Sequence, residues 1–209
     1  KYDLIVDLEG SMESALVCRK AKKKRGAEVL GPSFQREGAH VFYSRITGTR
    51  NVDRHPIYQC MDVLDYLGIS KAPIEFPLNL PIIKMDGIEN KYNVIAPDPT
   101  KPKNSLSAAF WEKIIQKSRL QVIIFAKKKL AQDLESLKDH FNRKKLLLIK
   151  SPLSLGDKAS LIKASSFTIC CSLDNMSLLN ALNKRGLMIN PGCNKTIHQP
   201  LSEKCSILI

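Results

Sequence analysis

The chain has 209 residues, of which 44% are apolar and 25% charged, a composition typical of one large or two small globular domains. Its 33 Lys and Arg residues against 20 acids give a net charge of +13, which favours an anionic partner, although a generally basic protein surface explains the same excess. Aromatic residues make up only 6%, which argues against base stacking on aromatic platforms, and no apolar run approaches the roughly 18 residues of a membrane span.

The six cysteines form no C-x-x-C pair, and no histidine lies at zinc-finger spacing from them. We therefore expect a reducing compartment, no disulfide framework and no metal site. The chain starts at Lys1 and enters a strand at once, so we expect it to be part of a longer protein.

The first part of the chain predicts an α/β unit. Residues 2–8 (YDLIVDL) are typical of a buried strand, and a helix should run from Ser11 to the basic run before Gly26. A short strand is expected at 27–30, followed by helices at 34–45 and 56–67. The segment 70–90 carries three prolines and a glycine and is the best linker candidate. We place a partial N-terminal domain at 1–72, a linker at 73–90 and a C-terminal domain at 91–209.

The second part alternates short apolar strands with amphipathic helices. Strands are expected at 92–96, 120–126, 145–149, 167–171 and 187–190, and helices at 105–118, 128–142, 154–164 and 174–184. This alternation predicts parallel β-α-β units, whose sheet needs helices on both faces.

The ligand of such a sheet lies outside the carboxyl ends of its strands. Three loops are therefore of interest, at 97–104, 126–129 and 171–176. The first, PDPTKPKN, and the second, AKKKL, bring lysines close to helix N-termini, where backbone amides attract anions. These loops indicate a cleft for a nucleotide diphosphate, with ordinary solvated loop charge as the alternative.

Three stretches of the first part carry recognisable motifs: KYDLIVDLEG with SALVCR, REGAHVFYSR, and HPIYQCMDVLDYLGI. They are similar to the D-x-Q-G, R-E with F-Y-x-R, and H-A-V-E-R motifs of the bacterial heptosyltransferases of lipopolysaccharide core synthesis, glycosyltransferase family 9. YNVIAPDPTKPKNSLSAAFWEKII and SLGDKASLIKASSFTICCSLDNMSLLNAL follow the family's order in the second half. The resemblance implies a GT-B glycosyltransferase with two Rossmann-like domains and parallel sheets, the first domain incomplete here.

The resemblance also implies site residues. Arg36, Arg45 and His55 would bind an anionic Kdo-type acceptor, and Thr100 and Lys101 would lie beside the donor phosphates. Further donor-side residues would be Ser172 and Asp174, which stand where the family has the Asp and Gly of D-[ST]-G. The catalytic base, on the family's S-x-G-D loop, is expected upstream of Lys1. The implied substrate is ADP-heptose, with no metal or other cofactor and no nucleic-acid partner, at a cytoplasmic location.

The donor motif is degenerate. Asn104 and Ser177 replace the family's Lys and His, and ICCSLDNMSLLNAL lacks the glycine that lets backbone amides approach a diphosphate. We expect Asp174 to cap the helix that begins near Asn175 and to occupy the amides that a phosphate needs.

Three hypotheses follow. The first is an active heptosyltransferase-like enzyme, and the second is a catalytically inactive relative that retains the fold as a binding module. The third is an anion or nucleic-acid binder acting through CRKAKKKRG, where six of the seven residues 19–25 are basic. For this run, a solvated helix terminus is the simplest explanation, and peripheral contact with an anionic inner-membrane surface is the second.

Overall fold

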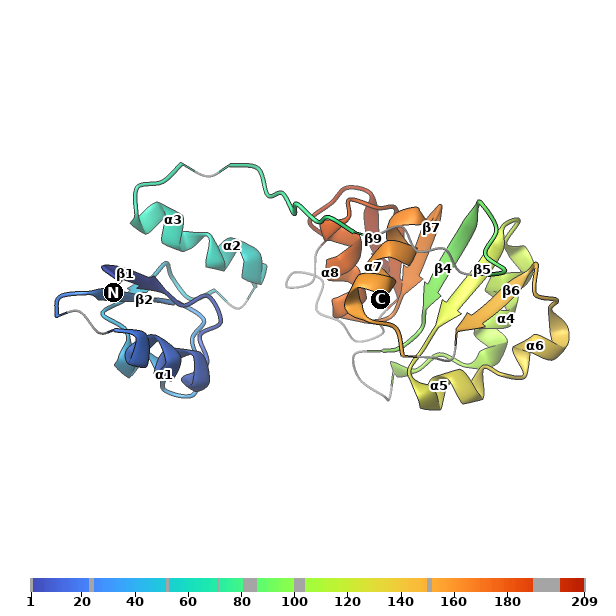
Figure 1. Ribbon diagram of the computed structural model, residues 1–209, viewed down its shortest axis with the longest axis horizontal. Helices are drawn as coiled ribbons and strands as arrows, with labels where there is room; N and C mark the ends of the chain where they lie inside the picture. Colours follow the sequence, from blue (N-terminus) through green and yellow to red (C-terminus); the bar gives the residue numbers. More distant parts are fainter. Residues whose placement is uncertain are drawn as a thin grey trace. The chain divides into compact units, whose positions relative to one another are not determined.

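The computed structural model describes residues 2–22, 25–51, 53–70, 72–80, 86–99, 104–149, 152–189 and 200–208. The chain divides into two compact units, Lys1–Ile74 and Glu75–Ile209, each built around its own parallel sheet (Figure 1). The division falls at the beginning of the segment for which we predict a linker.

The first unit contains a three-stranded sheet in the order β1-β2-β3, with all strands parallel. Helix α1 packs against β1 and β2, whereas α3 packs against β2 and β3. The elements are β1 (Leu4–Val6), α1 (Met12–Ala21), β2 (Glu28–Pro32), the 3-10 helix η1 (Ala39–Phe42), β3 (Arg45–Thr47), α2 (Pro56–Cys60) and α3 (Asp62–Tyr66).

The second unit contains a six-stranded parallel sheet in the order β6-β5-β4-β7-β8-β9. Its elements are β4 (Tyr92–Ala96), α4 (Ala108–Lys117), β5 (Gln121–Phe125), α5 (Lys128–Asp133), α6 (Leu137–His140), β6 (Leu146–Ile149), α7 (Leu155–Ala164), β7 (Phe167–Cys170), α8 (Leu173–Ala181), β8 (Gly186–Ile189) and β9 (Cys205–Leu208).

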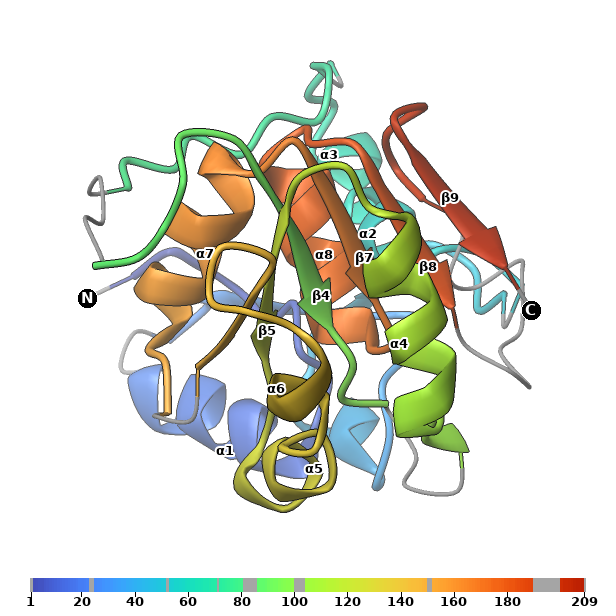
Figure 2. The same ribbon diagram turned by 90° about the vertical axis from the view of Figure 1, so that its right-hand side faces the viewer.

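Helices cover both faces of this sheet, as predicted (Figure 2). Side chains of β4 alternate between the two faces, so Val94 packs with residues of α7 and α8, whereas Ile95 packs with α4, α5 and α6. Trp111 of α4 is fully buried in the second cluster. The α/β fold class and the two parallel sheets are therefore confirmed.

Several details of the prediction are wrong. The helices expected at 56–67 and 128–142 are each divided in two, into α2 and α3 and into α5 and α6. Residues 34–45 form η1 and the start of β3 rather than one helix, because Glu37 and Gly38 both have positive φ, 60° and 78°, at which a right-handed helix cannot propagate. Strand β1 is an edge strand rather than a buried one, and its first and last residues, Leu4 and Val6, are exposed. Strand β9 was not predicted.

Candidate functional site

The strand order of the second unit reverses direction between β4 and β7. From β4 the chain moves outward to β5 and β6, and it then returns to β7 and continues outward on the other side to β8 and β9. The two central strands stay paired at their carboxyl ends, where the Cys171 amide donates to the Ala96 carbonyl at 3.1 Å. Open parallel sheets bind ligands at such a reversal, outside the carboxyl ends of the strands.

Asp98 lies on the loop that leaves β4 at this point. Both of its carboxylate oxygens accept the backbone N–H of Lys127, at 3.0 and 2.9 Å, so this carboxylate lies at the start of α5. Burial raises the pKa of Asp98, and this effect outweighs the hydrogen bond from Lys127 and the charges of Lys127 and Lys158, which lower it. A half-buried carboxyl with a raised pKa at a ligand-binding edge is a candidate functional group.

A pocket of about 620 Å³ opens beside Asp98, entirely within the second unit. Its apolar wall includes Phe125, Ala131 and Leu153, and its polar groups include Lys127 and Lys158. The other described residues of its lining are Ala126, Gln132, Glu135 and Pro152. A concave site of this size, mostly apolar with a few polar groups, is typical of small-molecule binding.

The junction of β7 and α8 caps itself, but not through Asp174. Ser172 is the N-cap, and its hydroxyl accepts the backbone N–H of Asn175 at 3.4 Å and the Asn175 side-chain amide at 2.9 Å. Asp174 is exposed in the first turn of α8, and the structure gives its carboxylate no hydrogen bond to a described amide. The prediction that Asp174 caps this helix is therefore wrong, because α8 begins two residues earlier than expected.

The other two predicted donor-side residues, Thr100 and Lys101, lie outside the described residues. Of the donor set, the structure therefore places only Ser172 and Asp174. Both follow β7 at the edge of the sheet that also carries Asp98.

On the predicted acceptor side, Arg36 lies between two acids. Its guanidinium is 3.6 Å from a Glu9 oxygen and 3.8 Å from a Glu37 oxygen, and all three side chains are more than half exposed. Glu37 adopts a left-handed backbone and also accepts the N–H of Met12 at the start of α1, at 3.2 Å. The charge of Arg36 is thus balanced locally by carboxylates.

Arg45 and His55 have different surroundings. Arg45 is exposed within β3, where it is the register partner of Leu30 in β2. Arg36 and His55 instead lie on the loops that follow the carboxyl ends of β2 and β3, so the structure places the three residues at different levels of the sheet. The His55 Nδ1 accepts the N–H of Ile57 at 3.2 Å and so caps α2. This ring therefore has a structural role at the start of α2.

The Asp7 carboxylate, in the stretch that resembles D-x-Q-G, is fully used by the fold of the first unit. It accepts the backbone N–H groups of Glu9 and Gly10 at 2.9 and 3.1 Å, and the hydroxyls of Ser14 and Tyr43, both at 2.7 Å. Burial would raise the pKa of Asp7, but these hydrogen bonds together lower it below 3.8. With four donors, Asp7 holds β1, α1 and the approach to β3 together.

Comparisons with solved structures identify the architecture. The chain is similar to E. coli heptosyltransferase WaaC with ADP at 18% identity and a TM-score of 0.76, over 99% of this chain and 66% of that one. It is also similar to a glycosyltransferase family 9 protein from Veillonella parvula DSM 2008 at 13% identity and a TM-score of 0.78, over 99% and 62%. The E. coli ADP-heptose lps heptosyltransferase II matches at 16% identity and a TM-score of 0.73, over 99% and 68%.

This chain has the GT-B fold of the heptosyltransferases. No family model matches its sequence, and no curated protein does. The chain spans just under two thirds of the length of the WaaC structure that it matches. Among the described residues, no helix is long and apolar enough to cross a membrane.

Two of the three loops selected from the sequence contribute to the pocket, 97–104 through Asp98 and 126–129 through Lys127, whereas no described lining residue comes from 171–176. Neither Asp98 nor Lys158 was singled out from the sequence. A usable signal existed for Asp98, which is a polar residue two positions after the end of β4. No comparable signal existed for Lys158, because α7 brings it to the pocket only through the tertiary fold.

Proposed function

We propose that the chain is a diverged member of glycosyltransferase family 9 and that its second unit binds the ADP-sugar donor of a heptosyl-type transfer. The observation that carries this proposal is the pocket of about 620 Å³ at the carboxyl edge of the sheet, beside the reversal in strand order. That position is where Rossmann-type sheets hold nucleotides, and the volume lies within the roughly 300–1,000 Å³ of small-molecule sites.

The lining suits a nucleotide. Phe125, Ala131 and Leu153 offer an apolar surface to a base, and the ammonium groups of Lys127 and Lys158 can offset the charge of a diphosphate. We assign Thr100 and Lys101 to the same phosphates on the basis of the resemblance. Asp98 opposes phosphate binding when ionised, because its carboxylate already occupies the Lys127 amide. Donor affinity should therefore be weak.

On the acceptor side, we assign Arg36, Arg45 and His55 to an anionic lipopolysaccharide-core sugar. Transfer would proceed by direct displacement at the anomeric carbon, with a general base that deprotonates the acceptor hydroxyl and that is not among these residues. The proposal includes no metal or cofactor, and it places the protein in the cytoplasm with peripheral contact to an anionic inner-membrane surface.

A second candidate is a catalytically inactive relative that keeps the fold as a binding module. Two contacts favour it. The Ser172 hydroxyl is committed to Asn175 at the start of α8, and the Asp98 carboxylate is committed to the Lys127 amide at the start of α5. The strand–helix junctions after β7 and β5 are thus occupied by side chains of the protein itself.

Calorimetric titration with ADP tests the donor site. We expect a dissociation constant near 1 mM, or about −4 kcal/mol, for the wild type. Lys158→Gln should weaken it several-fold, whereas Lys163→Gln, an equal loss of charge further along α7 and outside the pocket lining, should leave it unchanged. Equal effects of the two variants would show that ADP responds only to net charge, and the pocket would lose its assignment.

A further inference from the structure

Among the described residues that line the pocket, Gln132 is the one uncharged side chain that can form hydrogen bonds. The other polar side chains of this lining are charged: Asp98, Lys127, Glu135 and Lys158. A nucleotide joins a charged diphosphate to an uncharged base whose edge carries hydrogen-bond donors and acceptors. The two kinds of polar side chain in the lining can therefore serve different parts of the ligand.

The charged side chains gather around Asp98. Burial raises the pKa of Asp98, and the charges of Lys127 and Lys158 act against this effect, so both ammonium groups lie close to its carboxylate. The remaining acid, Glu135, has its Oε1 atom 3.6 Å from the Nζ atom of Lys138. The two lysines beside Asp98 suit the diphosphate, which leaves the base for another part of the lining.

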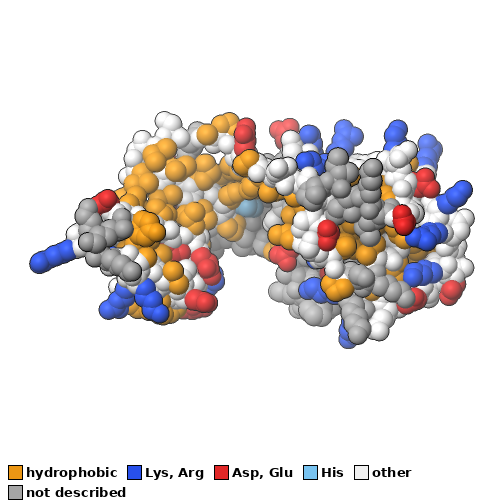
Figure 3. All heavy atoms as spheres, viewed as in Figure 1, with side chains coloured by type: hydrophobic (Ala, Val, Ile, Leu, Met, Phe, Trp, Pro, Cys, Tyr) orange, Lys and Arg blue, Asp and Glu red, His pale blue; other side chains and the backbone are white. Residues whose placement is uncertain are grey.

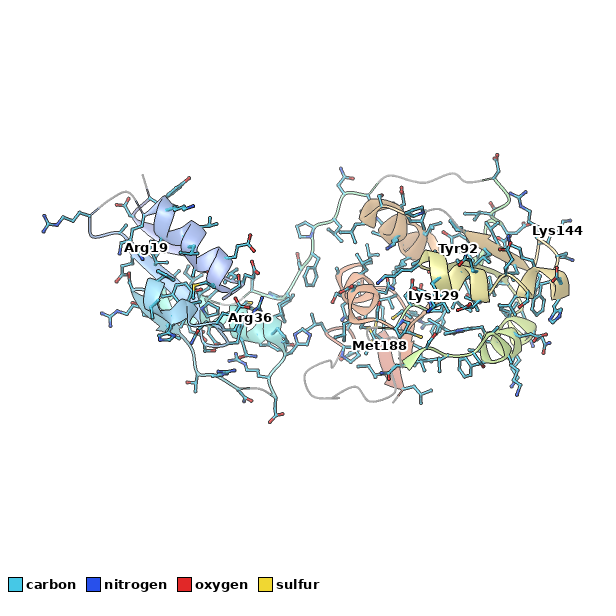
Figure 4. The ribbon with its side chains drawn as sticks, turned by 90° about the horizontal axis from the view of Figure 1, so that it is seen from below. Arg19, Arg36, Tyr92, Lys129, Lys144 and Met188 are labelled. Atoms are coloured by element: carbon cyan, nitrogen blue, oxygen red, sulfur yellow. The ribbon has the colours of Figure 1, made fainter. Side chains whose placement is uncertain are left out.

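Gln132 lies away from this charged end, on α5. Five residues separate it from Lys127, which places it about 7–8 Å further along the helix. It directly follows Ala131, a buried residue of the apolar wall that we assign to the base. Figure 4 marks this helix by Lys129, three residues before Gln132. The Gln132 side chain is exposed, and its carboxamide makes no hydrogen bond with a residue that the structure describes.

We propose that Gln132 determines the base specificity of the pocket by binding the edge of adenine. The carboxamide oxygen accepts the 6-amino group, and the carboxamide nitrogen donates to the neighbouring ring nitrogen N7, a pair of hydrogen bonds that glutamine forms with adenine in other complexes. Guanine and hypoxanthine have a carbonyl at position 6, which offers no donor to the carboxamide oxygen. The inference rests on the proposed donor site and adds the residue that selects its base.

Two ligands of equal charge test the proposal, ADP and purine riboside 5′-diphosphate, which differs from ADP only by lacking the 6-amino group. Lys and Arg side chains are spread over the second unit in Figure 3, so any diphosphate is attracted to its surface. The ratio of the two dissociation constants cancels this attraction and reports on the base alone. Backbone amide shifts of the isotope-labelled full chain give both constants.

The wild type should bind ADP at least about 5-fold more tightly than purine riboside diphosphate. Gln132→Ala should bind the two ligands equally. Gln132→Glu keeps an acceptor for the 6-amino group, so it should still prefer ADP, although its negative charge weakens the binding of both ligands. Asp133→Ala is the control, because Asp133 is the next residue, is exposed and is not among the described lining residues, and it should keep the ratio of the wild type.

Equal binding of the two ligands by the wild type, or an unchanged preference for ADP in Gln132→Ala, would overturn the role of Gln132 while leaving the donor site in place. No binding of ADP by the wild type would overturn both. Partial unfolding of a variant cannot imitate the expected result, because it lowers the apparent affinity for both ligands by the same factor and leaves their ratio unchanged.

Discussion

Replacing Ser172 by alanine should destabilise the second unit far more than replacing Asp174. The Ser172 hydroxyl is buried and accepts two N–H donors of Asn175, the backbone amide at the start of α8 and the side-chain amide. Loss of a cap costs about 0.5–2 kcal/mol, and a buried donor left without an acceptor costs about 1–3 kcal/mol more. We therefore expect Ser172→Ala to lower the free energy of unfolding by roughly 2–4 kcal/mol.

Asp174 provides the matched control. Its exposed carboxylate has no hydrogen-bond partner among the described residues and is attracted to the N-terminal end of the helix dipole, so Asp174→Ala should cost no more than about 0.3–1 kcal/mol. The chain has a single tryptophan, Trp111, which is fully buried in the second unit, so its fluorescence reports the unfolding of that unit alone. Urea titrations of both variants give the two differences directly.

A larger loss for Asp174→Ala than for Ser172→Ala would refute the assignment of the cap. It would show that α8 begins later than the structure places it and that Asp174 occupies the amides at its start. The unfolding slope with urea should be the same for both variants, because neither changes the surface exposed on unfolding.

Three further predictions concern ionisable groups. The four donors lower the pKa of Asp7, so its ionised carboxylate stabilises the first unit above about pH 4, and this contribution is lost as pH falls below 3.8. Amide exchange in β2 should therefore be slower in the wild type than in Asp7→Asn at about pH 6, and this difference in exchange rate should shrink towards about pH 3. Burial raises the pKa of the Cys170 thiol, and burial with the nearby Asp98 charge raises the pKa of Cys171 to about 12, so iodoacetamide at pH 8 should label both only after unfolding. Asp98→Asn keeps an acceptor for the Lys127 amide but removes the negative charge, so it should bind ADP more tightly than the wild type. Binding of ADP by the wild type should strengthen as pH falls through the raised pKa of Asp98, and the variant should lack this pH dependence. Weaker binding by Asp98→Asn would instead make the carboxylate a ligand contact.

The sequence was most informative where burial is regular, on one face of a helix or along the whole of a central strand. The alternation along β4, α4 and β5 placed these elements to within a few residues, because Ile115 and Trp111 repeat at helical spacing and the strands are continuous apolar runs. The helix predicted at 34–45 was wrong because Glu37 adopts a left-handed backbone and its carboxylate accepts the N–H of Met12, 25 residues away at the start of α1, a contact that local sequence does not encode.

Site residues were harder to predict than elements. The sequence predicted the N-cap of α8 two positions too late. Ser172, Asp174 and Asn175 are all residue types that cap helices well, and only the observed start of the helix shows that Ser172 is the cap. Asp98 and Lys127 are 29 residues apart and meet only because β4 and β5 are neighbours. Strand β9 is as short as β6, β7 and β8, but it is recognisable as a strand only through its pairing with β8.

The central claim is that the pocket beside the strand reversal holds the nucleotide of an ADP-sugar. Mapping backbone amide shifts of the isotope-labelled protein during titration with ADP tests this most directly. We predict saturable shifts at Asp98, Lys127 and Lys158, with a midpoint near 1 mM and no comparable shift at Lys91 or Lys144. Shifts confined to the amino ends of the strands, or none at the three pocket residues up to 10 times that concentration, would contradict the claim.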